Sequence, residues 1–186
     1  MNSVYIHDDG VELNGELVLP QSPSGVVVFI HGSGSSWLNP RNNFFAEVLQ
    51  NQGMGTLLFN FLTHEEEQDY ATRFDVSLLA KRLLAATEWL MTNPETCALR
   101  LGYLGSGIGI AGALRAAAKM GDKISAVVSR SGRPDLAGEI ELSRVTTPTL
   151  LIVGSADFGI VELNRRACEM MNWEKARPDS RCDTFA

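Results

Sequence analysis

Cysteine is scarce in this 186-residue chain, and its pattern argues against two common classes of small protein. There are three cysteines, an odd number, and no CxxC pair or Cys/His cluster occurs. A disulfide framework needs an even set of cysteines, and a structural zinc site needs clustered thiols and imidazoles. We therefore expect reduced cysteines, no metal site and a reducing, cytoplasmic compartment.

Basic residues are also in the minority. Lys and Arg number 16 against 22 Asp and Glu, which gives a net charge of −6. A nucleic-acid surface requires a concentrated patch of positive charge. The longest basic cluster here is the pair Arg165-Arg166. The composition therefore predicts no nucleic-acid partner.

Long apolar runs are absent as well. No stretch approaches the roughly 20 residues that a membrane-spanning helix requires. The opening sequence MNSVYIHDDG has neither the basic nor the apolar segment of a signal peptide. We therefore expect no membrane association. Hydrophobic residues nevertheless make up 45% of the chain, which is enough for one folded core.

Short apolar runs alternate with helical patterns along most of the chain. An N-terminal hairpin is predicted around Asp8-Asp9-Gly10. The run GVVVFIH then suits a strand that is buried on both faces of a parallel sheet. Repeated strand–helix units follow, so the sequence predicts an α/β fold with a doubly wound, mostly parallel sheet. The parallel strands are expected at Val26–Ile30, Leu57–Asn60, Leu101–Leu104, Ala126–Val128 and Leu150–Val153.

The C-terminal residues break this pattern. The segment NWEKARPDSRCDTFA has no hydrophobic period, so we expect a single domain over 1–171 and an irregular tail over 172–186. Thr149–Val153 would then be an apolar edge strand, whose unpaired N–H and C=O groups favour self-association. The sequence predicts a homodimer through this exposed sheet edge, unless the tail covers it.

A glycine-rich turn follows the third of the parallel strands and has two interpretations. The first is a nucleophile elbow, in which G-x-S-x-G makes a sharp turn from a strand into a helix. The frame Gly105-Ser106-Gly107-Ile108-Gly109 has both flanking glycines at the right spacing, but Gly107 stands where the nucleophile belongs. A frame shifted by one residue would make Ser106 the nucleophile, with bulky residues in place of the outer glycines.

The second interpretation of this turn is a dinucleotide-binding fingerprint. Gly107, Gly109 and Gly112 match G-x-G-x-x-G after a strand and at the start of a helix. Arg130, which follows the next strand, could meet the 2′-phosphate of an NADP-type nucleotide. No acidic residue ends that strand, however, and the glycines could equally serve close packing of the helix on the sheet.

Several segments together identify a family resemblance. FIHGSGSSWLNPRNNFFAEVLQNQGMGTLLFNFLTHEEE, TRFDVSLLAKRLLAATEWL, VVSRSGRPDLAG and PTLLIVGSADFGIVELNRRA resemble the dienelactone hydrolase-like branch of the α/β-hydrolases. The likeness extends from about Gly25 to Ala167. It implies hydrolysis of small esters or lactones by a serine-hydrolase-type triad that needs no cofactor.

The resemblance also implies roles for individual residues. The backbone N–H groups of Ser33 and Ile108 would form the oxyanion hole, which stabilises charge on a carbonyl oxygen under attack. Asp157, in GSAD after the last predicted strand, matches the acid of the triad, although an aspartate there could also simply cap a helix. His31 is expected to hold its loop by a hydrogen bond, because the family's base does not occupy that position.

Two departures from the family pattern affect catalysis. Gly107 has no side chain with which to attack a substrate. The catalytic histidine should follow Asp157 after one more strand, but the three histidines, His7, His31 and His64, all precede it. We therefore expect an α/β-hydrolase fold that is truncated at its C-terminus and impaired or inactive, a pseudoenzyme. The alternatives are a working ester hydrolase that uses Ser106 or a base from a partner chain, and an NADP-type nucleotide-binding module.

Overall fold

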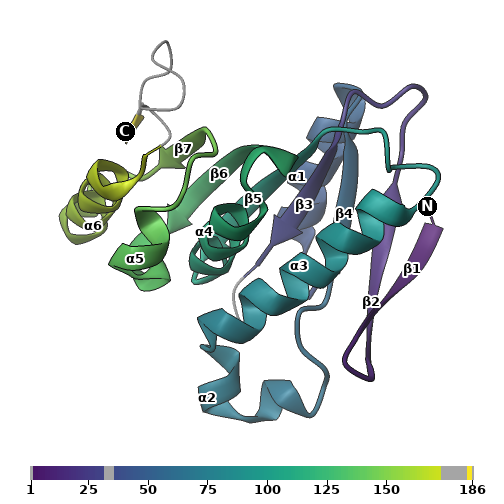
Figure 1. Ribbon diagram of the computed structural model, residues 1–186, viewed down its shortest axis with the longest axis horizontal. Helices are drawn as coiled ribbons and strands as arrows, with labels where there is room; N and C mark the ends of the chain where they lie inside the picture. Colours follow the sequence, from purple (N-terminus) through teal and green to yellow (C-terminus); the bar gives the residue numbers. More distant parts are fainter. Residues whose placement is uncertain (1, 32–35, 173–183, 186) are drawn as a thin grey trace.

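The computed structural model describes residues 2–31, 36–172 and 184–185 (Figure 1). Its strands form one eight-stranded sheet in the order β1-β2-β4-β3-β5-β6-β7-β8. The strands are β1 (Asn2–Asp8), β2 (Val11–Val18), β3 (Val26–Ile30), β4 (Gly55–Phe59), β5 (Leu101–Gly107), β6 (Ile124–Gly132), β7 (Thr149–Ile152) and β8 (Thr184–Phe185). The helices are α1 (Pro40–Asn51), α2 (Tyr70–Arg73), α3 (Val76–Thr92), α4 (Gly109–Met120), α5 (Glu139–Leu142) and α6 (Phe158–Met170), with short 3-10 turns η1 (Glu66–Gln68), η2 (Gly121–Lys123) and η3 (Pro134–Ala137).

Most of the sheet is parallel, as the sequence predicted. The hairpin β1–β2 is antiparallel and joins the sheet through an antiparallel β2–β4 pair. All pairs from β4 through β3, β5, β6 and β7 to β8 are parallel. The five predicted parallel strands are all present, and their ends agree with the expected ones to within four residues. The doubly wound α/β fold is therefore confirmed.

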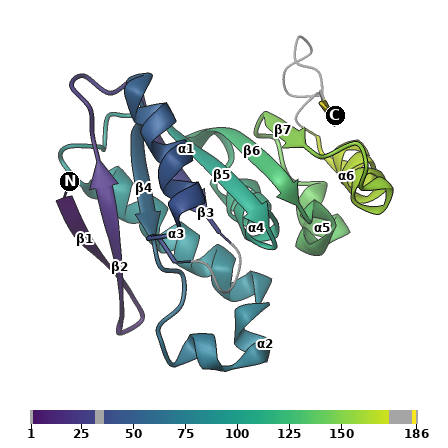
Figure 2. The same cartoon turned by 180° about the vertical axis from the view of Figure 1, so that it is seen from behind.

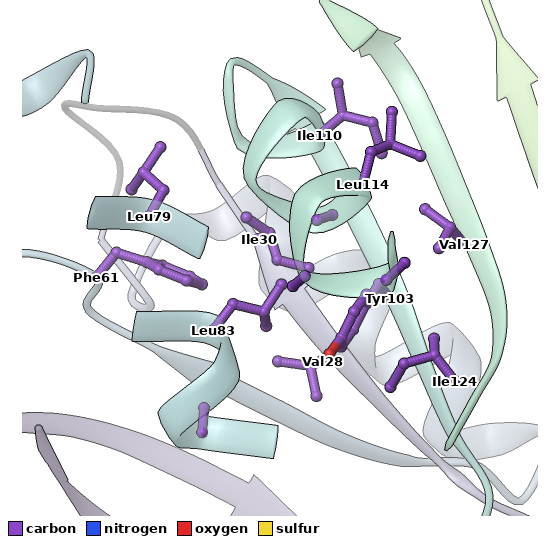
Figure 3. Packing of buried hydrophobic residues seen from close by; sticks show 14 of the residues in the cluster. Val28, Ile30, Phe61, Leu79, Leu83, Tyr103, Ile110, Leu114, Ile124 and Val127 are labelled. Carbon is purple, nitrogen blue, oxygen red and sulfur yellow. The ribbon is translucent and has the colours of Figure 1, made fainter. Parts of the chain in front are cut away.

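Two hydrophobic clusters of unequal size cover the two faces of the sheet. The larger cluster packs α3, α4 and α6 onto one face. Figure 3 shows the part of this cluster to which α3 and α4 contribute. Tyr103 of β5 and Val127 of β6 meet Ile110 and Leu114 of α4 there. The smaller cluster lies under α1 on the opposite face and has only Phe29, Ala46 and Leu58 as its buried members. Figure 2 shows α1 in front of β3 and β4, with α3 and α4 behind the sheet.

Local residues explain where the long helices begin. Asp75 caps α3, since its carboxylate accepts hydrogen bonds from the backbone N–H groups of Ser77 (2.8 Å) and Leu78 (3.1 Å). Asn39 caps α1 through the N–H of Arg41, and Pro40 occupies the first turn, where its missing N–H costs nothing. These caps fix how each helix leaves its preceding loop, and therefore how it lies against the sheet.

A buried arginine ties the N-terminal hairpin to the helical layer. Arg82 of α3 is only 3% exposed. Its Nε lies 3.1 Å from a carboxylate oxygen of Asp8 on β1, and its Nη2 lies 2.8 Å from Glu66. Removing one member of such a network would leave an uncompensated charge in the interior.

The predicted tail differs from expectation where the structure describes it. Thr184 and Phe185 pair in parallel with Leu151 and Ile152 of β7. At these positions β7 is therefore not a free edge, which is the exception that the sequence left open: part of the tail covers this edge. Residues 173–183 and 186 of the predicted tail lie outside the described residues.

The cysteines also depart from expectation. Cys97 is an exposed free thiol, whereas Cys168 on α6 is disulfide-bonded. The prediction of reduced cysteines therefore does not hold for Cys168. It came from the odd count and spacing alone, and neither shows which residues the fold brings close together.

The helices of the described residues include no candidate membrane span. None of them is both long and apolar enough to cross a bilayer.

Candidate functional site

The carboxyl ends of the parallel strands bring together most of the residues singled out in the sequence. His31 follows β3, Gly107 ends β5, Gly132 ends β6 and Asp157 follows β7. In open α/β sheets, ligands bind in the crevice outside these strand ends. The candidate site therefore lies at this edge of the sheet, around the junction of β5 and α4.

Gly107 adopts the backbone conformation of a sharp strand-to-helix turn. Its φ is +55°, a left-handed value that ordinary side chains rarely adopt. A Cβ placed on Gly107 would meet no heavy atom within 4 Å. The turn therefore presents this position to open space, as a nucleophile elbow presents its serine.

The flanking glycines are needed for close packing. A Cβ on Gly105 would lie 2.9 Å from the Cα of Ile110 in α4, and a Cβ on Gly109 would lie 2.8 Å from the carbonyl oxygen of Ile30 in β3. Both distances are too short for a real contact without movement of the backbone. Glycines on either side of an open central position match the frame that places Gly107 at the apex.

Ser106 lies on β5, one residue before the apex. Its register partner on β6 is Arg130, and both line a small cavity on the α1 side of the sheet together with Asn42 and Phe45. Gly105, the preceding residue, faces α4 on the opposite side. Ser106 therefore faces α1 and not the apex at which Gly107 turns.

His31 has the structural role that the sequence suggested. It is buried, and its Nε2–H donates a hydrogen bond to the carbonyl oxygen of Phe59 at 3.0 Å. Its ring also makes an edge contact with Phe61, with 5.6 Å between ring centroids. These contacts join the end of β3 to the end of β4 and occupy the imidazole.

The structure describes one of the two predicted oxyanion donors. Ser33 lies outside the described residues. Ile108 is the residue immediately before α4, with helical backbone angles, so its N–H belongs to the first turn of that helix. Such N–H groups have no partner within a helix and favour negative charge near them.

Asp157 caps a helix. Its carboxylate accepts a hydrogen bond from the N–H of Ile160 at 3.3 Å at the start of α6, and the residue is exposed. This is the capping role that the sequence left open beside the acid role. The two roles are compatible in position, because the cap lies at the same edge of the sheet as Gly107.

The end of β6 supports the elbow in a way that the sequence did not reveal. The N–H of Arg133 donates to the carbonyl oxygen of Gly107 at 2.9 Å. Asn164 of α6, fully buried, donates to the carbonyl oxygens of Gly132 (3.1 Å) and Ile160 (2.8 Å). The sequence offers one signal of this contact, a polar residue on the buried face of α6. That signal does not identify the groups to which Asn164 donates.

Ser131 is a further feature that the sequence did not indicate. It is an exposed residue with a φ of +48°, within β6 and one residue before Gly132. Two other non-glycine residues among those described, Asp9 and Ser22, share this left-handed conformation. Ser131 differs from them in lying beside the elbow, since Gly132 pairs with Gly107.

The two arginines after β6 have separate environments. Arg133 makes a bidentate ion pair with Asp135 at 2.8 Å, and this hydrogen bonding raises the pKa of its guanidinium. Arg130 lies 4.7 Å from the centre of the Phe45 ring. Partial burial, and then the positive charge of Arg41, lower the pKa of Arg130.

The fingerprint glycines have structural explanations that involve no nucleotide. Gly109 allows α4 to approach β3, as described above. A Cβ on Gly112 would lie 3.0 Å from the Cβ of Leu79, so this glycine lets α4 approach α3. Within the described residues, no group of three or more His, Cys, Asp or Glu side chains could hold a metal ion.

Comparisons with known proteins agree with this architecture. No family model matches the chain. The chain is 48% identical in sequence to dienelactone hydrolase from Anabaena variabilis. The crystal structure of that protein matches with a TM-score of 0.87 and covers 91% of this chain and 80% of that chain. Est1E from Butyrivibrio proteoclasticus is 16% identical, with a TM-score of 0.79 over 100% of this chain and 88% of that one, and it shows the fold alone.

Two curated proteins from Mycobacterium tuberculosis strains have a different name. Each is called "Putative phosphoribosyl transferase" and is 52% identical to this chain over 157 residues. The match covers 84% of this chain but 35% of each of those proteins. The chain thus spans about a third of the length of the curated relatives it matches.

Proposed function

Because the chain belongs to the dienelactone hydrolase-like family of the α/β-hydrolases, we propose that it is a pseudoenzyme of that family. It keeps the site for a small ester or lactone but does not hydrolyse it by a triad. One observation carries this proposal: the apex of the elbow is a glycine. Gly107 has the left-handed backbone and the open surroundings of the nucleophile position, without an atom that can attack a carbonyl.

Nucleophilic catalysis requires a side chain that forms a covalent intermediate and a base that takes its proton. Gly107 supplies neither a hydroxyl nor a thiol. His31, the histidine at this edge of the sheet, is buried and bonded to Phe59. A longer protein or a partner chain could bring a base to the site, but it could not give Gly107 a side chain.

The alternative nucleophile is disfavoured by the geometry. Ser106 is a strand residue that faces α1 beside Arg130, whereas the strained turn is one residue later. An attacking hydroxyl on Ser106 would therefore lie on the other side of the sheet from the first turn of α4. The oxyanion N–H groups and the nucleophile would not converge on one carbonyl group.

The remaining parts of the proposal concern the context of the site. Residues 1–171 act as a single domain without a resident metal or nucleotide. Asp157 retains the position of the triad acid, and the N–H groups of Ser33 and Ile108 retain the oxyanion positions. The phosphoribosyl transferase name belongs to much longer proteins, so that activity is not part of the proposal.

Ester hydrolysis tests the proposal directly. The purified chain is mixed with p-nitrophenyl acetate, and release of p-nitrophenol is followed through the first seconds and at steady state. We expect no burst and no rate above that of a Ser106→Ala variant. A turnover typical of esterases that Ser106→Ala abolishes would overturn the proposal and establish the shifted frame.

A further inference from the structure

Strand β6 has one extra residue where it runs beside the elbow. Arg130 of β6 pairs with Ser106 of β5, whereas Gly107, the next residue on β5, pairs with Gly132. Ser131 therefore has no register partner on β5 and forms a bulge between the two pairs. Bulges are common next to active sites, where they redirect one side chain of a strand.

The neighbours of Ser131 in the chain face opposite sides of the sheet. Arg130 lines the small cavity on the α1 side. Gly132 faces the other side, since a Cβ there would lie 2.5 Å from Cγ2 of Ile110 in α4. Ser131 itself is exposed, and its hydroxyl has no hydrogen-bond partner among the described residues. This hydroxyl therefore belongs to neither packed face and lies at the carboxyl edge of the sheet, beside the apex at Gly107.

The backbone conformation of Ser131 is unfavourable for a serine. Its φ of +48° is left-handed, a conformation that glycine adopts freely and that a Cβ disfavours. Asp9 and Ser22 have the same conformation in connections between strands, whereas Ser131 has it within a strand. Non-glycine residues in such conformations persist where their surroundings fix them, and they cluster at ligand-binding sites.

Hydrogen bonds from two elements fix the bulge in this conformation. The N–H of Arg133 donates to the carbonyl oxygen of Gly107 at 2.9 Å, and the buried side chain of Asn164 on α6 donates to the carbonyl oxygen of Gly132 at 3.1 Å. The residues after the bulge are thereby held to both β5 and α6. A glycine in place of Ser131 would remove the steric conflict, so packing and backbone geometry give no reason for a side chain here.

From these observations we infer that Ser131 is a ligand-binding residue of the site at Gly107, whose hydroxyl donates a hydrogen bond to the carbonyl oxygen of a bound ester or lactone. Esters and lactones accept hydrogen bonds but offer no donor, so a free hydroxyl complements them. A Cβ on Gly107 would meet no heavy atom within 4 Å, which leaves room for a ligand beside Ser131. The inference rests on the proposed function, from which it takes the class of ligand.

Titration of the isotope-labelled chain with δ-valerolactone, followed by two-dimensional NMR, tests the inference. We expect weak binding, in the range typical of so small a ligand, that shifts the amide signals of Gly107, Ile108 and Gly132. Ser131→Ala should weaken this binding about three- to tenfold, which is the usual effect of losing one hydrogen bond between neutral groups.

A second serine with a left-handed backbone provides the matched control. Ser131→Gly and Ser22→Gly each replace an exposed serine, with φ of +48° and +55°, by a residue that suits the conformation, so neither should lower the urea midpoint of unfolding. Ser22 lies in the connection from β2 to β3, at the amino end of the parallel strands. Ser131→Gly should therefore weaken lactone binding as much as Ser131→Ala does, and Ser22→Gly should leave it unchanged.

Two results would overturn the inference in different ways. Equal affinity for the lactone in the unaltered chain, Ser131→Ala and Ser131→Gly would remove Ser131 from the site and leave the proposed function intact. An unaltered chain whose signals do not shift at up to about 100 mM lactone would overturn the inference together with the ligand site of the proposed function. The esterase assay, which tests the loss of catalysis, is independent of both comparisons.

Discussion

At the scale of single residues, the glycines of the elbow serve different physical purposes. Gly107 is needed for its backbone angle, and space for a side chain is available there. Gly109 has an ordinary backbone angle but no space, because the carbonyl oxygen of Ile30 is 2.8 Å from any Cβ. The sequence suggested this frame from spacing alone, and only the structure separates the requirement for an angle from the requirement for space.

A matched pair of alanine variants should show this difference. Gly107→Ala should lower the free energy of unfolding by about 1–2 kcal/mol, the cost of a left-handed backbone at a residue with a Cβ. Gly109→Ala should cost more, about 3 kcal/mol, because α4 and β3 must move apart. Urea denaturation measures both, and equal losses would mean that the two glycines are not distinct in this way.

Gly107→Ser adds the hydroxyl that the apex lacks. The side chain has space, but no histidine in the described site is free to take its proton. We expect ester turnover to remain far below that of an esterase, with at most slow acylation by a very reactive ester through the oxyanion N–H groups. Full turnover in this variant would show that a base already lies within reach of the apex.

At the scale of elements, the strands were predictable and some of their connections were not. Apolar runs such as Val26–Ile30 indicate buried strands because both of their faces are covered. The acidic segment after β4 contains η1 and α2 and places Glu66 against Arg82. An arginine in an amphipathic helix does not reveal that a hairpin 70 residues earlier will bury it.

Arg82 and its neighbour Lys81 offer a test of this burial. Arg82→Ala should lower the free energy of unfolding by about 3–5 kcal/mol, because Asp8 and Glu66 would lose their common partner in the interior. Lys81→Ala removes a half-exposed ammonium that pairs with Asp9 and lies 3.5 Å from Asp8, but Arg82 still compensates Asp8, so the loss should be small compared with that of Arg82→Ala. Thermal and urea unfolding of the two variants provide the comparison, and similar losses would contradict the account of the network.

Helix α6 should respond to acid through one carboxylate. Hydrogen bonds from Arg165 and Arg166 lower the pKa of Glu162 to about 2. A depressed pKa in the folded state stabilises the fold above the unfolded value of about 4.3, and this contribution is lost as the pH falls toward 2. An NMR titration of the Glu162 carboxyl carbon should therefore have its midpoint well below 4, and a midpoint near 4.3 would show that these contacts do not persist.

At the scale of the whole molecule, the architecture and family followed from the sequence, whereas the uneven covering of the sheet did not. Alternation along β6 is weak in the sequence, since Val127 and Val128 are both apolar, yet one is buried and the other is half-buried. Only the packed structure shows that α1 lies mainly over β3 and β4 and reaches β5 and β6 through contacts with Leu104 and Arg130. The departure at Gly107 was visible in the sequence because the spacing of its neighbours defined a position for it.

The central claim is that the elbow lacks a nucleophile, and intact-mass spectrometry after treatment with a fluorophosphonate tests it most directly. This reagent forms a covalent adduct with an activated serine. The account predicts that the mass of the 186-residue chain stays unchanged under conditions in which a control serine esterase is fully modified. Stoichiometric labelling, traced by peptide mapping to Ser106 or to any other serine, would contradict it.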